Sequence, residues 1–243
     1  MWNLGYPAQA SKLIKEAGGE GGELPDPCTA VMVADYDSMV QLVSKDAPGA
    51  KLYADDLTNI STQYGFAGEI AVASMVCAWA DGWGGDPKGI DLLRESLVEF
   101  AAAQGELSRS WLCGLIAELC PKFGRNDEAV AALEDAIAYR TRSGEGFAES
   151  EICRLRGEAE LQLGRFHIGS ATKWFERAID AAHKRSARIA ELRATSNLAR
   201  LLVKQHKRDK ARVMLAEIYN WFTEGFETAD LKDAKTLLTE LPG

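Results

Sequence analysis

The chain has 243 residues, of which 47% are hydrophobic and 26% are charged, and its net charge is −8. This is the composition of an ordinary soluble globular protein, and no stretch approaches the roughly 18 consecutive apolar residues that a membrane helix needs. Its start, MWNLGYPAQASKLIKEA, has polar residues where a secretory signal would carry its apolar stretch, so we expect a cytoplasmic protein with no membrane contact.

Residues 1–66 are predicted to form degenerate N-terminal repeats. The segment GGEGGELPDP (18–27) predicts a flexible loop. KDAPGAKLYADDL (45–57) aligns with GDPKGIDLLRESL (85–97) at an offset of 40, which places Asp56 where a small or apolar residue is expected. We expect the chain to start at the second helix of a hairpin, which would leave an apolar face open. Two alternatives follow: residues 1–66 form a proper end of the array, or they leave a face open for a missing neighbour.

Residues 67–228 contain the best-defined repeats. A turn residue is followed by a small residue at +5, a bulky one at +9 and a small or apolar one at +12, positions that share one stripe of a helix. The turn glycines Gly84, Gly124 and Gly164 lie 40 residues apart. The members of the pattern are Gly89, Leu93 and Ser96; Ala129, Leu133 and Ala136; Ala171, Phe175 and Ala178; Ala211, Leu215 and Ile218 after His206; and, more weakly, Ala10, Ile14 and Ala17 after Gly5.

A second set of helices is predicted before each turn, at residues 69–83, 109–123, 149–163 and 189–205. Each pairs with the helix that follows it, and a last helix near residues 229–240, within the segment 229–243, is expected to cap the array. No run alternates apolar and polar residues as a strand would. The predicted fold is all-α, a right-handed superhelical solenoid of about five antiparallel helix pairs in a single domain, residues 1–243.

The pattern of turn, small, bulky and small residues resembles the tetratricopeptide repeat, here with a period of 40 residues. The segment from Glu191 to Leu238 is similar to the C-terminal repeat array of large bacterial signalling ATPases and nucleotide cyclase fusion regulators. The resemblance implies a repeat architecture that binds protein partners. It implies no ATPase activity for this chain, because the phosphate-loop motif GxxxxGK[ST] is absent.

No catalytic, cofactor-binding or metal-binding residue is predicted. The five cysteines form no CxxC pair and are interpreted as buried reduced thiols, and the three histidines form no HxxxH or HExxH motif. No Gly-x-Ser-x-Gly elbow occurs. The segment GWGGDPKG (82–89) has the wrong spacing for a phosphate loop and is interpreted as a turn, with Pro87 opening the next helix.

The first helix of each hairpin is expected to line a groove that holds a protein or peptide partner. The candidate groove residues are Trp111, Glu118, Glu151, Arg154, Glu158, Arg193, Asn197 and Arg200. Arg154 and Arg193 are the sharpest candidates, because the arginine fork suits a partner's carboxylate. The alternative is that these charges pair with one another, as Glu151, Arg154 and Glu158 would at spacings of three and four residues.

Residues 184–212 hold ten Lys and Arg against Glu191 and Asp209, a local excess that could attract phosphates. The acidic net charge and the lack of a helix-turn-helix motif argue against nucleic acid. We predict a non-catalytic protein-interaction scaffold, the partner-binding or sensor arm of a bacterial signalling system. A small-molecule or peptide-ligand sensor that uses the same groove is the alternative, and a homo-oligomer or an N-terminal neighbour stays open.

Overall fold

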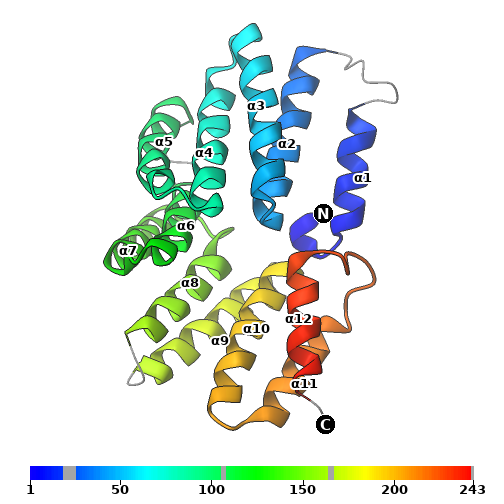
Figure 1. Ribbon diagram of the computed structural model, residues 1–243, viewed down its shortest axis with the longest axis vertical. Helices are drawn as coiled ribbons and strands as arrows, with labels where there is room; N and C mark the ends of the chain where they lie inside the picture. Colours follow the sequence, from blue (N-terminus) through cyan, green and yellow to red (C-terminus); the bar gives the residue numbers. More distant parts are fainter. Residues whose placement is uncertain (19–25, 105–107, 164–166, 242–243) are drawn as a thin grey trace. The chain divides into compact units, whose positions relative to one another are not determined.

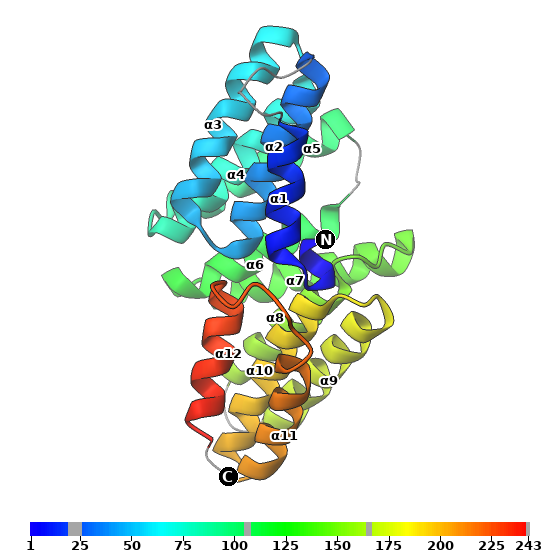
Figure 2. The same ribbon diagram turned by 90° about the vertical axis from the view of Figure 1, so that its right-hand side faces the viewer.

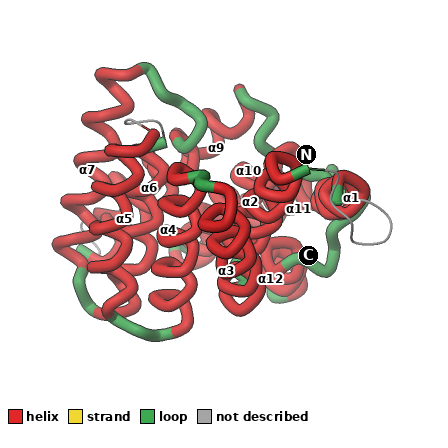
Figure 3. The backbone as a smooth tube through the Cα atoms, turned by 90° about the horizontal axis from the view of Figure 1, so that it is seen from above, coloured by secondary structure: helices red, strands yellow, loops and turns green. Residues whose placement is uncertain are grey.

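The computed structural model describes residues 1–18, 26–104, 108–163 and 167–241. Within these ranges the regular structure is helical and includes no strand, and short loops join most of the helices (Figure 3). None of the described helices has both the length and the apolar composition needed to cross a membrane. The chain divides into two compact units: unit 1 is Met1–Ala8 with Asn126–Gly243, and unit 2 is Gln9–Arg125.

Unit 2 contains most of the first helix, from Gln9 on, and all the helices up to Arg125. In chain order these are α1 (Pro7–Ala17), α2 (Pro27–Ser44), α3 (Ala47–Tyr64), α4 (Ala67–Gly84), α5 (Lys88–Gln104), α6 (Arg109–Leu119) and the 3-10 turn η2 (Cys120–Phe123). From α2 to α5 each helix packs against the next, and α4 also packs against α2 and α6 (Figure 1). The first helices of successive hairpins are therefore neighbours, as a stack of helix pairs requires.

Unit 1 repeats this arrangement. It contains the 3-10 turn η1 (Trp2–Leu4) and the helices α7 (Asn126–Ser143), α8 (Glu149–Gln162), α9 (Ile168–Lys184), α10 (Arg188–Lys204), α11 (Arg208–Tyr219) and α12 (Ala229–Thr239). Helix α10 packs against α8, α9, α11 and α12, so it is the centre of the unit (Figures 1 and 2). The last helix lies close to where the sequence predicts it.

The repeat pattern marks the buried stripe of the second helices, as predicted. Ala171, Phe175 and Ala178 of α9 are fully buried, and so are the matching residues of α7 and α11. In α1 the pattern fails: Ala10 is buried, but Ile14 is only half-buried and Ala17 is exposed. The first repeat match was therefore wrong beyond Ala10.

The unexpected Asp56 is explained by a shift of one residue in the repeat register. Helix α3 buries Ala54, Leu57 and Ser61, which correspond to Leu93, Ser96 and Phe100 of α5 at an offset of 39 rather than 40. With this offset Asp56 faces solvent, so its charge carries no desolvation penalty.

The turns agree with the sequence except in one detail. Gly124 has the left-handed backbone that a helix end favours (φ 72°), whereas Gly84 is the last residue of α4 and the left-handed residue is Gly85 (φ 110°). Ser186 and His206 supply the same conformation without glycine. Gly164, most of the predicted loop at 18–27 and residues 105–107 lie outside the described residues.

Residues from both ends of the sequence meet in the core of unit 1. Phe175, Leu192, Leu215 and Leu231 are fully buried there, and Trp2 of η1 packs against this cluster. The start of the chain thus covers part of unit 1, an arrangement that the repeat pattern does not predict.

Two glycines set the closest approach between α4 and α5. A Cβ atom added to Gly89 would lie 2.4 Å from the backbone nitrogen of Gly82 and 2.6 Å from the carbonyl oxygen of Ala78. Real Cβ atoms do not come this close to a rigid backbone, so the helices would have to separate. Gly89 is the small residue at +5, and its size is a packing requirement.

We expect Gly89→Ala to destabilise unit 2 by about 2–3 kcal/mol, because overpacking forces helices apart. Gly84→Ala is the matched control: nothing lies within 4 Å of a Cβ at this helical position. That change should be neutral or slightly stabilising, since alanine lowers the entropy of the unfolded chain. Hydrogen exchange of α4 and α5 peptides measures both effects, and equal protection in the two variants would contradict the packing argument.

Candidate functional site

The side-by-side helices α8, α10 and α12 of unit 1 carry a connected row of polar side chains. Six of the residues predicted for the groove lie on α8 and α10, and α12 adds two acids. We call this row the polar ladder; its members are Glu151, Arg154, Glu158, Arg193, Asn197, Arg200, Asp230 and Asp233. They come together because residues three and four apart share one face of a helix.

Arg154 is the centre of the ladder on α8. Its side chain is buried, and its guanidinium group donates to both carboxylate oxygens of Glu151, at 2.6 and 3.0 Å, and to Glu158 Oε1 at 2.7 Å. The amide of Asn197 donates to the same oxygen of Glu158 at 2.7 Å and so connects α10 to α8. The paired charges that the sequence offers as the alternative are therefore present.

Arg193 connects α10 to α12 by a two-pronged contact. Its Nε donates to Asp230 Oδ1 at 2.7 Å, and its Nη2 donates to Asp230 Oδ2 at 2.8 Å. Burial alone would lower the pKa of Arg193, but the charge and hydrogen bonds of Asp230, with the charge of Glu151, raise it above its ordinary value. Arg200 makes a more exposed pair with Asp233.

The ladder arginines are thus occupied by carboxylates of the same chain. Three arginines face four carboxylates, so the ladder offers no excess positive charge to a partner's acidic group. Arg154 and Arg193 stay predicted groove residues, and their forks pair with carboxylates of the same chain. The ladder also places Arg193 and Arg200, two of the basic residues of segment 184–212, in ion pairs.

The other two groove candidates, Trp111 and Glu118, lie on α6 of unit 2. Trp111 is half-buried, and both oxygens of Glu118 accept hydrogen bonds from the ammonium group of Lys45 at the end of α2. The same ammonium group lies 5.1 Å from the ring centre of Trp83, which stacks on the buried Trp79. Glu118 therefore helps to fix α2 against α6.

Replacing Asp230 with alanine should destabilise the docking of α12 by about 2–3 kcal/mol, because Arg193 would keep its charge in a largely buried position without its partner. Asp233→Ala is the matched control on the same helix. It removes an exposed pair and should cost less than about 1 kcal/mol.

Thermal unfolding together with hydrogen exchange of α12 peptides measures the difference between these two variants. If the two variants lose the same protection of α12 amides from exchange, burial does not make the Arg193–Asp230 pair more important than the Arg200–Asp233 pair.

A carboxylate of unit 2 lies in an unfavourable environment. Asp35 of α2 has one buried oxygen, Oδ1, without a hydrogen-bond partner among the described residues. Burial, with the negative charge of Glu69 on α4, raises the pKa of Asp35 to about 6. Its ionisation therefore opposes folding at neutral pH.

The sign of this effect gives a pH-dependent prediction. The folded pKa lies above the unfolded one, so the destabilisation is absent below about pH 4, grows up to about pH 6 and is complete above. Asp35→Asn should raise the free energy of unfolding by up to about 3 kcal/mol at pH 7.5 and leave it unchanged at pH 4.

Urea denaturation at the two pH values checks this prediction. The exposed Asp56→Asn is the control and should show no pH-dependent gain. A gain for Asp35→Asn of the same size at both pH values would contradict the assigned titration.

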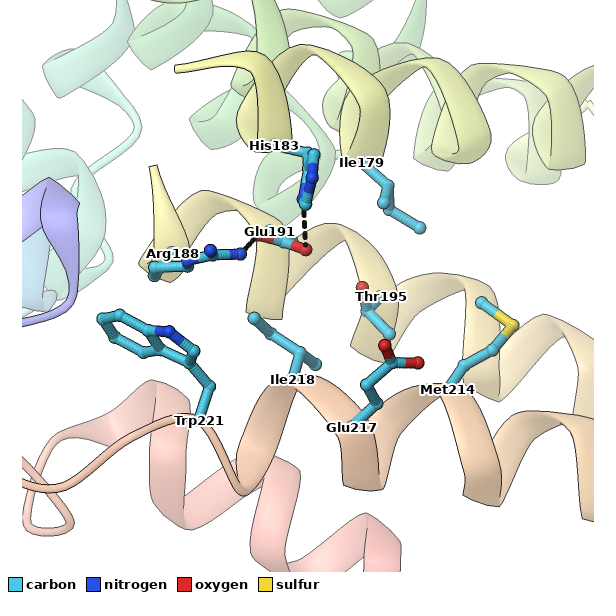
Figure 4. Close-up of a pocket in the computed structure, with 9 residues that line it drawn as sticks. All are labelled: Ile179, His183, Arg188, Glu191, Thr195, Met214, Glu217, Ile218 and Trp221. Carbon is cyan, nitrogen blue, oxygen red and sulfur yellow. Dashed lines mark hydrogen bonds and ion pairs between the residues drawn. The ribbon is translucent and has the colours of Figure 1, made fainter. Parts of the chain in front are cut away.

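A cleft of about 400 Å³ lies on another face of α10, between α9, α10 and α11 (Figure 4). Arg188, Glu191 and Thr195 of α10 line it. At 100° per residue these three positions are roughly 180° around the helix from Arg193, Asn197 and Arg200 of the ladder. Helix α10 therefore has two opposed polar faces.

The sequence did not predict the cleft or the acids of α12. Thr195 of α10 meets Met214 and Glu217 of α11 only when these two helices pack, so no single segment contains a spacing that reveals all three. Asp230 and Asp233 are spaced to share one face of α12, and this spacing is visible in the sequence. From the sequence, this helix is predicted only as a cap of the array, not as part of the site.

The cysteines are free thiols, and three of them, Cys113, Cys120 and Cys153, are buried as predicted. Cys28 is exposed in the first turn of α2, which corrects the prediction for that residue. Burial raises the pKa of Cys77 and of Cys153 to about 11, so both stay protonated at neutral pH. The described residues contain no cluster of three His, Cys, Asp or Glu side chains arranged to hold a metal ion.

Comparisons with known proteins identify the fold. No family model matches the sequence, and no curated protein matches it. Among solved structures, the chain is similar to the crystal structure of yeast Tom70, with a TM-score of 0.55 and 12% sequence identity. The match covers 97% of this chain but only 43% of that one.

From α2 to α5 in unit 2 and from α7 to α12 in unit 1, each helix packs against the next along the sequence, and the likeness to Tom70 extends over nearly the whole chain. The fold is therefore a helical-hairpin solenoid of the tetratricopeptide type, which confirms the predicted all-α fold class. At 12% identity the likeness concerns the fold alone.

Proposed function

We propose that the chain is a non-catalytic scaffold that binds a segment of a partner protein along the polar ladder of unit 1. The observation that carries the proposal is the ladder itself, a row of polar side chains that crosses three neighbouring helices and is held in place by ion pairs. Such a rigid row can present hydrogen-bonding groups to a partner without the entropic cost of ordering long side chains.

The chemistry of the ladder indicates the kind of segment. Because its arginines are already paired, a partner gains most from neutral polar side chains and from its own backbone groups, which can bond to Asn197 and to the remaining lone pairs of the Glu158, Asp230 and Asp233 carboxylates. A terminal carboxylate would meet a ladder in which acids outnumber arginines. Recognition should therefore depend little on the C-terminus of the segment.

We also propose that this scaffold is the partner-binding arm of a bacterial signalling system. The support is the residue pattern from Glu191 to Leu238, on which we infer a resemblance to the arrays of bacterial signalling ATPases. A single continuous array over residues 1–243 belongs to the same proposal.

A display library of peptides, presented with free and with amidated C-termini, tests the ladder. We expect selected peptides to bind equally in both forms, and we expect Asn197→Ala and Arg200→Ala each to weaken binding about ten-fold, as central interface residues do. Isothermal titration calorimetry gives the affinities. Lys210→Ala, an exposed change on α11, is the control and should have no effect.

If both ladder variants bind the selected peptides as tightly as the unchanged chain, the ladder is not the binding surface. The second candidate function, sensing of a small ligand, is favoured by the cleft of Figure 4. A thermal shift with a metabolite, and none with any peptide, would support this second function over the first.

A further inference from the structure

The cleft between α9, α10 and α11 is lined by the apolar side chains of Ile179, Met214 and Ile218 (Figure 4). Its volume of about 400 Å³ lies within the range of small-ligand sites. Ile179 comes from α9, whereas Met214 and Ile218 come from successive turns of α11. These side chains offer a contact surface for a short hydrocarbon chain.

At one end of the cleft the charges compensate one another. Glu191, a buried acid, accepts a hydrogen bond of 2.7 Å from Arg188, and its other oxygen lies 3.3 Å from His183 Nδ1. The guanidinium group of Arg188 lies 5.0 Å from the ring centre of Trp221. Arg188 is therefore held on two sides and offers little to an incoming anion.

The charge of Glu217 is not compensated in this way. This exposed residue projects from α11 toward the buried Thr195 of α10 (Figure 4), and it makes no ion pair with another described residue. Its carboxylate borders the cleft beside the threonine hydroxyl and the apolar side chains. The cleft thus combines one open negative charge, one hydroxyl acceptor and a hydrocarbon-like surface.

We propose that this cleft binds an alkylammonium group. The ammonium would donate to the Glu217 carboxylate and the Thr195 hydroxyl, and the alkyl stem would cover Met214 and Ile179. An anion would be repelled by Glu217 and would find Arg188 occupied, while a neutral alcohol would gain no charge attraction from the carboxylate. The cation is thus the ligand class that this arrangement favours.

Two sources share this chemistry: a free alkylamine and the side chain of a lysine. The proposal gives a ligand class to the second candidate function. It does not depend on the ladder, which lies on the opposite face of α10. Failure of either site therefore leaves the other untouched.

Titration of the full chain by amide NMR at pH 7.5 tests the site with hexylammonium, hexanol and hexanoate. We expect hexylammonium to shift amides of α9, α10 and α11 and to bind more tightly than the other two probes. Glu217→Gln should weaken it about five-fold, and Thr195→Val about two-fold, through loss of one charged and one neutral partner. Asp209→Asn, an exposed acid at the other end of α11, is the matched control and should change nothing.

A second pair of probes distinguishes a free alkylamine from a lysine side chain as the ligand. The first probe is a lysine whose α-amino and carboxyl groups are blocked, and the second is the same compound with its side chain acetylated. Binding of the free form at least as tight as that of hexylammonium assigns the site to a lysine of a partner, whereas binding of hexylammonium alone assigns it to a free amine. Equal binding of hexanol and hexylammonium, tighter binding of hexanoate, or unchanged affinity in Glu217→Gln would overturn the proposal. A peptide selected from the display library should bind Glu217→Gln as tightly as it binds the unchanged chain. This result separates the test of the cleft from the test of the ladder.

Discussion

The close approach of neighbouring helices is the constraint on which the rest of the structure depends. Gly89 lets the backbones of α4 and α5 come together, and Ala171 and Ala178 flank Phe175 on the buried stripe of α9. Small residues at these contacts shorten the distance between helices, and one bulky residue fills the space that remains. Because each hairpin stacks in this way, the first helices α8, α10 and α12 become neighbours, and only then can their polar faces form one continuous row.

Helix α10 shows how this packing creates two separate surfaces. Its buried residues Leu192, Leu198 and Leu202 hold it between its neighbours, while polar residues remain on two opposed faces. One face carries the ladder, where ion pairs between helices fix the side chains. The other borders the cleft, where Glu191 neutralises Arg188 but nothing described neutralises Glu217. The two proposed binding surfaces therefore lie on opposite faces of one helix.

The fold was largely predictable from the sequence, because its repeat depends on local helix periodicity and on residue size. The stripe of Ala129, Leu133 and Ala136 and the position of the last helix were found in this way. The polar site was predictable only in part. Arg154 pairs with residues of its own helix, at spacings that are visible in the sequence. Arg193, in contrast, pairs with Asp230, which lies 37 residues further along the chain. Such a pairing follows from how helices stack, and so does the cleft.

The most direct test of the central claim, that the ladder is a recognition surface, is hydrogen exchange of the full chain with and without a bound partner segment. A segment that lies along the ladder should slow exchange in α8, α10 and α12 together, because it adds contacts across all three helices. Protection confined to α9 and α11, or to helices of unit 2, would show that recognition takes place elsewhere.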